Sequence, residues 1–176
     1  MYASQTPVYP HLRHFLERQI GPRTRRPEVW RALRELTGLS EPRLSFALRW
    51  ARGPLIRIIP IRTTRGRFTA GAFVRRAPDS ILLNRGHVRQ FEQMHHQECA
   101  KLQMEAIVLH EIAHWGWWHT HRHPEPRGRE IGEEFEHRAY GHRPSEYAMC
   151  TPSARAQMAE RNFEDMFGSP IDVVVD

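Results

Sequence analysis

Apolar residues recur every three to four positions along the first fifty residues, which is the spacing of amphipathic helices. Proline and glycine mark where such helices begin and end, because proline suits a first turn and glycine a C-terminal cap. The pattern predicts three helices: residues 11–20, ended by Gly21-Pro22; residues 27–36, with Pro27 in the first turn and Gly38 as the stop; and a third, capped by Ser40, that runs toward Gly53-Pro54.

The middle of the chain changes to short apolar runs separated by turns that contain glycine or proline, a pattern typical of strands. It predicts strands at residues 55–62, 68–75 and 81–83. Pro60 has no N–H to donate, so we expect it at a sheet edge or at the end of the first strand.

The second half of the chain returns to helical spacing. It predicts helices at residues 87–98, 102–118, 129–140 and 153–167, and a short strand at 171–175. Helices, a small sheet and then helices again indicate an α+β fold, mostly helical with a small mixed or antiparallel sheet. We expect one domain overall, in which an N-terminal helical segment (1–53) packs on a core (54–176).

The 176 residues carry a formal net charge of +6, and all but one of the 26 lysine and arginine residues are arginine. Such a protein can bind nucleic acid, but the arginines are dispersed and no helix-turn-helix, zinc-finger or aromatic RNA-binding signature is present. We therefore expect no nucleic-acid partner.

The first ten residues lack the apolar core of a signal peptide, and no stretch is apolar enough to span a membrane. We expect a soluble protein, either cytoplasmic or exported without a cleaved signal peptide. Cys99 and Cys150 allow a single bridge without implying one, so a reducing compartment fits slightly better.

The strongest chemical signal is the segment His110-Glu111-Ile112-Ala113-His114. Four residues of α-helix turn through about 400°, so both imidazoles project from one face and can hold one tetrahedral metal ion. Glu111 lies beside the first histidine, where it can accept a proton from metal-activated water rather than bind the metal. The segment predicts a zinc metallopeptidase that hydrolyses peptide bonds, with His110 and His114 as metal ligands and Glu111 as the general base.

A catalytic zinc ion needs a third protein ligand, so that its fourth position is left for water. We predict Glu130, in the acidic helix after the motif, because Gly132 beside it would let that helix pack closely on the active-site helix. Glu136 is the alternative in the same helix. If the third ligand is a histidine, His121 or His123 in the preceding loop would take the role.

Supporting roles are predicted nearby. Glu134, one turn after Glu130, would orient an imidazole. Tyr140 is a candidate donor to the oxyanion of the tetrahedral intermediate. Before the motif, residues 81–84 are expected to form the edge strand along which an extended substrate binds.

The motif and the acidic helix after it resemble the gluzincin group of zinc peptidases. The pattern E-x-G-x-x-x-E-x-x-x-Y-G at residues 130–141 further resembles metallopeptidase domains of bacterial effector toxins, including those joined to type VI secretion spikes. The resemblance covers residues 105–141. It implies a zincin-like core, Zn²⁺ as cofactor, a protein or peptide substrate, and an effector or toxin role with a secretion apparatus or an immunity protein as partner. The alternative is a basic protein associated with nucleic acid, including a SprT-like protease that acts near DNA.

Overall fold

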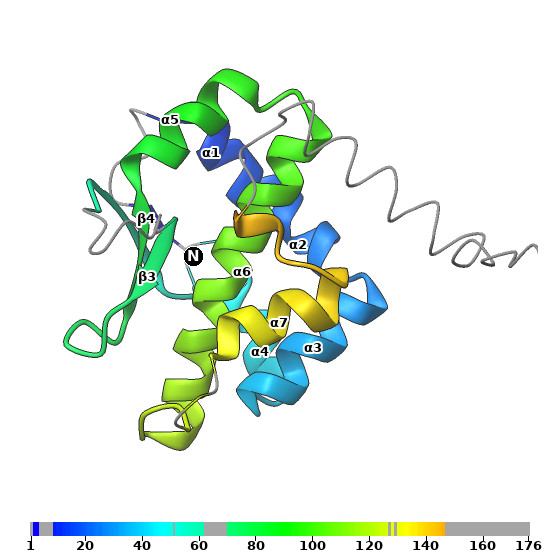
Figure 1. The fold of residues 1–176 in the computed structure, drawn as a ribbon, viewed down its shortest axis with the longest axis vertical. Coiled ribbons are helices and arrows are strands. Elements are labelled where there is room, and N and C mark those ends of the chain that lie inside the picture. Colours follow the sequence, from blue (N-terminus) through cyan, green and yellow to red (C-terminus); the bar gives the residue numbers. More distant parts are fainter. Residues whose placement is uncertain are drawn as a thin grey trace, which may run out of the picture.

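The computed structural model describes residues 2–3, 9–50, 52–61, 70–126, 128 and 130–146 (Figure 1). Helices dominate and accompany a small sheet, so the predicted α+β class is confirmed. The helical elements are α1 (Pro10–His14), the π-helical turn η2 (Phe15–Gln19), α2 (Ile20–Thr24), α3 (Pro27–Thr37), α4 (Glu41–Ala47), α5 (Arg85–Met94), α6 (Glu98–His121), α7 (Ile131–Tyr140) and the 3₁₀ turn η3 (Pro144–Glu146). The helix predicted at 153–167 and the strand predicted at 171–175 lie outside the described residues.

The sheet is mixed and has the strand order β1-β2-β4-β3. Its strands are β1 (Tyr2–Ala3), β2 (Leu55–Ile59), β3 (Gly71–Phe73) and β4 (Ser80–Asn84). Strand β2 runs parallel to both β1 and β4, whereas β3 runs antiparallel to β4. Pro60 directly follows β2, as predicted for the end of a strand.

The prediction that residues 81–84 form an edge strand is wrong, because β4 has β2 on one side and β3 on the other. Ile81 and Leu83 are buried in the core, and a nearly continuous apolar run is typical of an interior strand. Within the described part of the chain, β3 is the strand at that edge of the sheet.

The first helical stretch continues past the predicted stop at Gly21-Pro22 and ends at Thr24. The π-helical turn η2 interrupts the stretch, and α2 begins directly after it at Ile20. Pro22 therefore falls in the first turn of α2, where backbone N–H groups have no partner within the helix and proline is tolerated. The other two predicted helices correspond to α3 and α4, and Gly38 ends α3 in the left-handed conformation that suits glycine.

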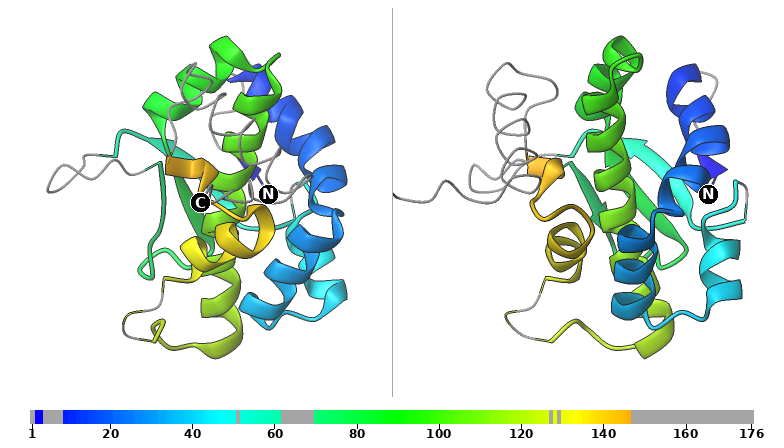
Figure 2. Two further views of the ribbon diagram at one scale, coloured as in Figure 1. Left: turned by 45° about the vertical axis from the view of Figure 1, so that its right-hand side comes forward. Right: turned by 90° about the vertical axis from the view of Figure 1, so that its right-hand side faces the viewer.

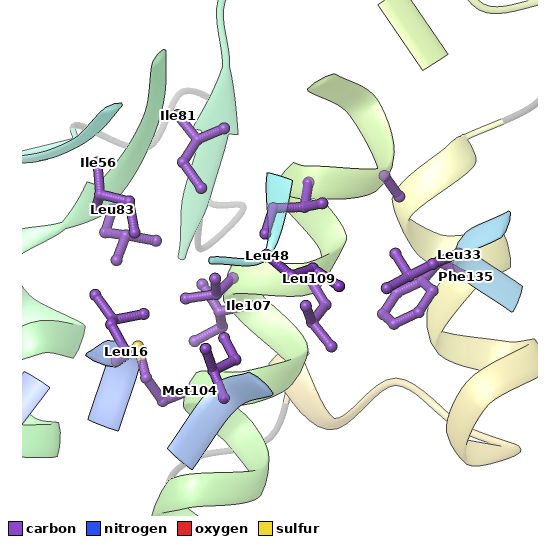
Figure 3. Packing of buried hydrophobic residues seen from close by; sticks show 14 of the residues in the cluster. Leu16, Leu33, Leu48, Ile56, Ile81, Leu83, Met104, Ile107, Leu109 and Phe135 are labelled. Atoms are coloured by element: carbon purple, nitrogen blue, oxygen red, sulfur yellow. The ribbon is translucent and has the colours of Figure 1, made fainter. Parts of the chain in front are cut away.

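Helix α6 lies at the centre of the fold and contacts the sheet as well as α3 and α7 (Figures 1 and 2). It extends beyond the predicted residues 102–118 at both ends, and its middle is buried nearly all round, as expected for a central helix. Figure 3 shows the packing around it, with Ile81 and Leu83 from the sheet and Leu33 and Phe135 from α3 and α7. A helix held on several sides presents its polar side chains at fixed positions.

The N-terminal helices and the rest of the chain contribute to one hydrophobic core. Helix α3 contacts both α6 and α7, and α1 contacts α5. The division into a segment 1–53 and a core 54–176 stays a prediction. None of the helices in the described ranges combines the length and the apolar character that a membrane crossing requires.

Cys99, in the first turn of α6, is disulfide-bonded. The sequence contains one other cysteine, Cys150, which lies outside the described residues. A disulfide is more common in oxidising than in reducing compartments.

Candidate metal centre

Helix α6 turns His110 and His114 toward α7. The centroids of the two rings are 4.9 Å apart, as expected for side chains one helical turn apart. The side chains retain 15% and 14% of their exposure, respectively. The pair is therefore largely buried but still reachable from solvent.

Glu130 lies opposite the two histidines, at the N-cap of α7 rather than inside the helix as predicted. Its carboxylate accepts a hydrogen bond from the backbone N–H of Glu133. One carboxylate oxygen, Oε1, is 3.3 Å from Nε2 of His110 and 2.5 Å from Nε2 of His114. The ligand atoms of these three side chains lie within 4.8 Å of one another, the one such group found within the described residues.

Gly132 allows α7 to approach α6 this closely. A Cβ atom at this position would overlap the imidazole ring of His110. Any other residue would therefore displace either the His110 ring or α7. The close packing predicted at Gly132 is confirmed.

The three donor atoms form a set that could hold a metal ion. Two imidazole nitrogens and one carboxylate oxygen form a ligand set of catalytic zinc sites, and they leave a fourth position open. Ligands at about 2.0–2.1 Å from a tetrahedral ion are separated from one another by about 3.3 Å. The distance from Nε2 of His110 to Oε1 of Glu130 is 3.3 Å, which matches this separation, whereas Nε2 of His114 lies at a hydrogen-bond distance of 2.5 Å from the same oxygen and would have to move apart from it to admit an ion.

A further carboxylate contacts the opposite nitrogen of each ring. Nδ1 of His110 lies 2.7 Å from Oε1 of Glu136, and Nδ1 of His114 contacts Oε1 of Glu125. Glu136 is fully buried and also accepts hydrogen bonds from Ser145, at 3.0 Å from the backbone N–H and 2.6 Å from the hydroxyl. Carboxylates in these positions fix the tautomer of an imidazole whose other nitrogen binds a metal.

The two glutamates predicted as third ligand lie on different sides of the imidazole rings. Glu130 lies on the Nε2 side of both rings, whereas the alternative, Glu136, lies on the Nδ1 side of His110. Glu134, predicted to orient an imidazole, forms an ion pair with Arg138, and its orienting role stays a prediction. The orienting position on His110 is occupied by Glu136.

Glu125 was absent from the predicted site. It lies in the loop between α6 and α7, before the acidic helix in which the other candidate carboxylates were predicted. The available signal was its separation of eleven residues from His114, short enough for a loop to return to the helix it has just left.

Hydrogen bonds in this cluster shift the proton affinities of its members. Burial by itself lowers the pKa of His110, but hydrogen bonds with Glu130 and Glu136 raise that pKa well above its usual value. For His114, burial is likewise outweighed by Glu125 and Glu130, which raise the pKa to about 9. Burial raises the pKa of Glu130, yet its contacts with the two histidines lower that pKa further than burial raises it. Three carboxylates around two rings attract positive charge, which a divalent metal ion supplies.

Glu111 projects toward the sheet instead of α7. A Cβ atom built on Gly71, the first residue of β3, would lie only 2.7 Å from Oε1 of Glu111. The residue is 4% exposed, and burial raises the pKa of its carboxyl while the imidazoles of His110 and His114 lower it. The carboxylate thus lies between the face of α6 that carries the histidines and the edge strand of the sheet.

The chain matches the profile of the family described as metallopeptidase toxin 3 over residues 5–141. The matched range includes α6, α7 and the loop between them, and so every residue of the candidate metal centre. The chain belongs to the metallopeptidase toxin 3 family. The resemblance to metallopeptidase domains of effector toxins is therefore confirmed, and a peptidase toxin implies protein substrates. Comparisons with curated proteins and with solved structures found no match.

In this metallopeptidase, Tyr140 is engaged away from the donor atoms that could hold a metal. Its hydroxyl donates a hydrogen bond of 3.0 Å to Oε1 of Glu105, and the guanidinium of Arg26 lies over its ring. This position does not support the predicted role of Tyr140 as a donor to the oxyanion.

The histidines after the motif pack against a tryptophan. His121 stacks on Trp117 with a centroid distance of 3.8 Å, and the ring of His123 meets Trp117 edge-on at 5.8 Å. Neither histidine belongs to the group of converging donor atoms.

Proposed function

We propose that the chain is a zinc-dependent peptidase in which His110, His114 and Glu130 hold one Zn²⁺ ion and Glu111 is the general base. The observation that carries this proposal is the convergence of two Nε2 atoms and one carboxylate oxygen between α6 and α7. Membership of a metallopeptidase family agrees with this donor set. A glutamate in the third position favours a gluzincin-like site over the histidine ligand of SprT-like proteases, and with it the peptidase over the nucleic-acid alternative.

The chemistry divides between the ion and the protein. When bound, a zinc ion would polarise the scissile carbonyl and lower the pKa of the attacking water. Glu111 accepts the proton released by that water and donates it to the amide nitrogen of the leaving group. Burial against Gly71 raises the pKa of Glu111, which suits a group that must release the proton as well as accept it.

The substrate is proposed to bind as an extended strand along the free edge of β3. This strand is paired with β4 on one side and lies at the edge of the described sheet. Its first residue, Gly71, is in contact with Glu111, so a peptide added at this edge would pass beside the general base. The substrate-binding role predicted for residues 81–84 thereby moves to the neighbouring strand.

Elemental analysis tests the metal site. The wild-type protein should contain about one zinc per chain. The double variant His110→Ala, His114→Ala should contain almost none, because both nitrogen ligands are lost. Equal zinc contents in the two proteins would rule out this site.

Competition with a chelator tests the third ligand. Glu130→Ala should weaken zinc binding the most, and Glu136→Ala less, because Glu136 acts on the metal only through His110. Glu133→Ala is the control, since this carboxylate pairs with Arg143 at 2.7 Å and its side chain is 42% exposed. If Glu130→Ala binds zinc like the wild type while Glu136→Ala does not, the ligand is Glu136.

The biological role we propose is that of an exported toxin, delivered by a secretion apparatus and inhibited in the producing cell by an immunity protein. The family description and the disulfide at Cys99 support export. Expression directed to the cytoplasm or to the periplasm of a bacterium should arrest growth in one of them, and Glu111→Ala should abolish the arrest. Equal toxicity of the wild type and this variant would exclude proteolysis as the cause.

A further inference from the structure

We propose that Glu125 is a positioning residue of the metal centre, which holds His114 and the start of α7 in register with each other. The inference rests on the proposed zinc site. It concerns a residue that the sequence motif does not include and that contributes no ligand atom to the converging group.

The two oxygens of Glu125 contact two different elements. Oε1 contacts Nδ1 of His114 on α6, and Oε2 accepts a hydrogen bond of 3.3 Å from the backbone N–H of Ile131. Ile131 is the first residue of α7 and directly follows Glu130. One carboxylate therefore contacts one proposed ligand and the neighbour of another.

The backbone conformation of the loop places this carboxylate against His114. Arg122 adopts a left-handed conformation immediately after α6, with φ of 57°, and turns the chain back toward the helix. Pro124 and Pro126 flank Glu125, and each proline fixes its own φ angle. Pro126 also restricts Glu125 to an extended backbone. A backbone with few alternatives holds the side chain against His114 at a low entropic cost.

The contact with Nδ1 determines the tautomer of His114, and thereby whether Nε2 is available to bind a metal ion. In the structure Nε2 of His114 lies 2.5 Å from Oε1 of Glu130, a hydrogen-bond distance. When Nδ1–H donates to a carboxylate and a zinc ion takes the place of the Nε2 proton, the lone pair of Nε2 would be directed at that ion. The contact with Ile131 fixes the end of α7 that carries Glu130. Loss of Glu125 should therefore disturb two of the three ligands, whereas Glu136 orients His110 alone.

A purely structural role is the alternative, because Glu125 also satisfies an N–H group at the start of a helix. The two roles differ in a measurable way. A helix cap affects the stability of the metal-free protein, whereas a positioning residue affects the zinc affinity of the folded protein and the tautomer of His114.

The test compares the full-length variants Glu125→Ala and Glu125→Gln with wild type. Glu133→Ala serves as the control, because it removes a carboxylate from the first turn of α7 that does not contact either ring. Zinc affinity is measured by chelator competition, the tautomer of His114 by ¹⁵N NMR of the imidazole in the zinc-loaded protein, and folding by thermal unfolding without metal.

We expect Glu125→Ala to lower zinc affinity by about 10–100-fold, the usual effect of removing such a partner. Glu125→Gln should recover part of the loss, because its amide oxygen can still accept from Nδ1–H. Glu133→Ala should stay within about twofold of wild type. The ¹⁵N shifts of His114 should move in Glu125→Ala and remain in place in the control.

Unchanged zinc affinity and an unchanged His114 tautomer in Glu125→Ala would overturn the inference, even if thermal stability falls, and would leave the proposed zinc site intact. If the wild type itself binds no zinc, the proposed function and this inference both fail.

Discussion

Helix α6 carries two buried glutamates six positions apart, and their surroundings differ sharply. Glu105 has 0% exposure and forms ion pairs with Arg23, at 2.5 Å, and with Arg26, while Tyr140 donates a hydrogen bond to it. Glu111 is 4% exposed, and within the described residues the charged groups that shift the pKa of its carboxyl are His110, His114, Glu130 and Glu136. The described partners of Glu105 are therefore arginines, and those of Glu111 belong to the candidate metal centre.

The partners of a buried carboxylate indicate whether its role is structural or catalytic. Arginine keeps its proton under all ordinary conditions, so the ion pairs of Glu105 with Arg23 and Arg26 are lasting contacts, and with Tyr140 they link α2, the start of α3 and α7 to α6. Imidazoles exchange protons or bind metal near neutral pH, so the environment of Glu111 can change during a reaction. Burial next to exchangeable partners is the combination expected of a catalytic group.

The sharpest test of this contrast is Glu111→Gln. We expect hydrolysis of a protein substrate to fall by roughly 10³-fold or more, because the proton acceptor is lost. Zinc content and the free energy of unfolding should not fall, because glutamine keeps the size of the side chain and removes a buried charge. Turnover of a cleavable substrate and denaturant unfolding measure the two effects. Near-wild-type turnover would show that Glu111 is not the base.

Glu105→Gln should show the opposite profile. Breaking a buried ion pair costs about 3–5 kcal/mol, and we expect about 2–3 kcal/mol here because water can partly solvate the arginines left behind. The side chains of Arg23 and Arg26 are 24% and 39% exposed. The folded variant should still bind zinc and hydrolyse substrate. Glu98→Gln is the control, since Glu98 is 70% exposed and its pairs should contribute less than about 1 kcal/mol.

Gly132→Ala tests how tightly the metal side of α6 is packed. The added Cβ would overlap the ring of His110, so we expect a loss of stability of about 1–3 kcal/mol together with weaker zinc binding. Gly21→Ala is the matched control, because a Cβ at Gly21 meets nothing within 4 Å and alanine favours the helix. Equal stability of the two variants would contradict the close approach of α7.

The smallest effect concerns His87, a buried residue of α5 whose pKa is lowered by burial. As pH falls below the usual histidine value of 6.5, the unfolded chain takes up a proton that the folded chain excludes. The free energy of unfolding should therefore decrease with falling pH, and this slope should be shallower in His87→Gln. Unfolding curves between pH 7.5 and 5 measure the difference, with both proteins expected to follow the same slope above about pH 7.

Much of this molecule is encoded by local patterns. The spacing of His110 and His114 determines that they share a helical face, and Gly132 marked a point of close packing between α6 and α7. Gly38 ended a helix where a glycine C-cap was expected. The shared helical face and the glycine cap depend on residues within one or two turns, so the sequence alone predicts them. The packing at Gly132 involves His110 on another helix and was predicted from the small residue beside Glu130.

Features that depend on which partner a residue or strand contacts were predicted poorly. The interior position of residues 81–84 follows from pairing with β2, some twenty-five residues earlier, which the strand pattern does not reveal. Glu134 and Glu136 lie on one short helix, and only their partners, Arg138 and His110, distinguish their roles. Glu125 lies in a loop, where no periodicity indicates the direction of a side chain.

The contacts of Glu105 and those of the candidate metal centre also differ in the sequence separation of their partners. His114 and Glu125 are eleven residues apart, whereas 82 residues separate Arg23 from Glu105. Each doubling of loop length adds about 0.6 kcal/mol to the free-energy cost of closing the loop, because more chain entropy is lost. Closing the loop between Arg23 and Glu105 therefore costs about 2 kcal/mol more than closing the loop between His114 and Glu125. The segment from α6 through α7 can therefore gather its histidines and carboxylates before the N-terminal helices dock. Zinc supplied during refolding would then bind a locally formed hairpin of helices and favour its formation, which makes this segment the expected nucleus of folding.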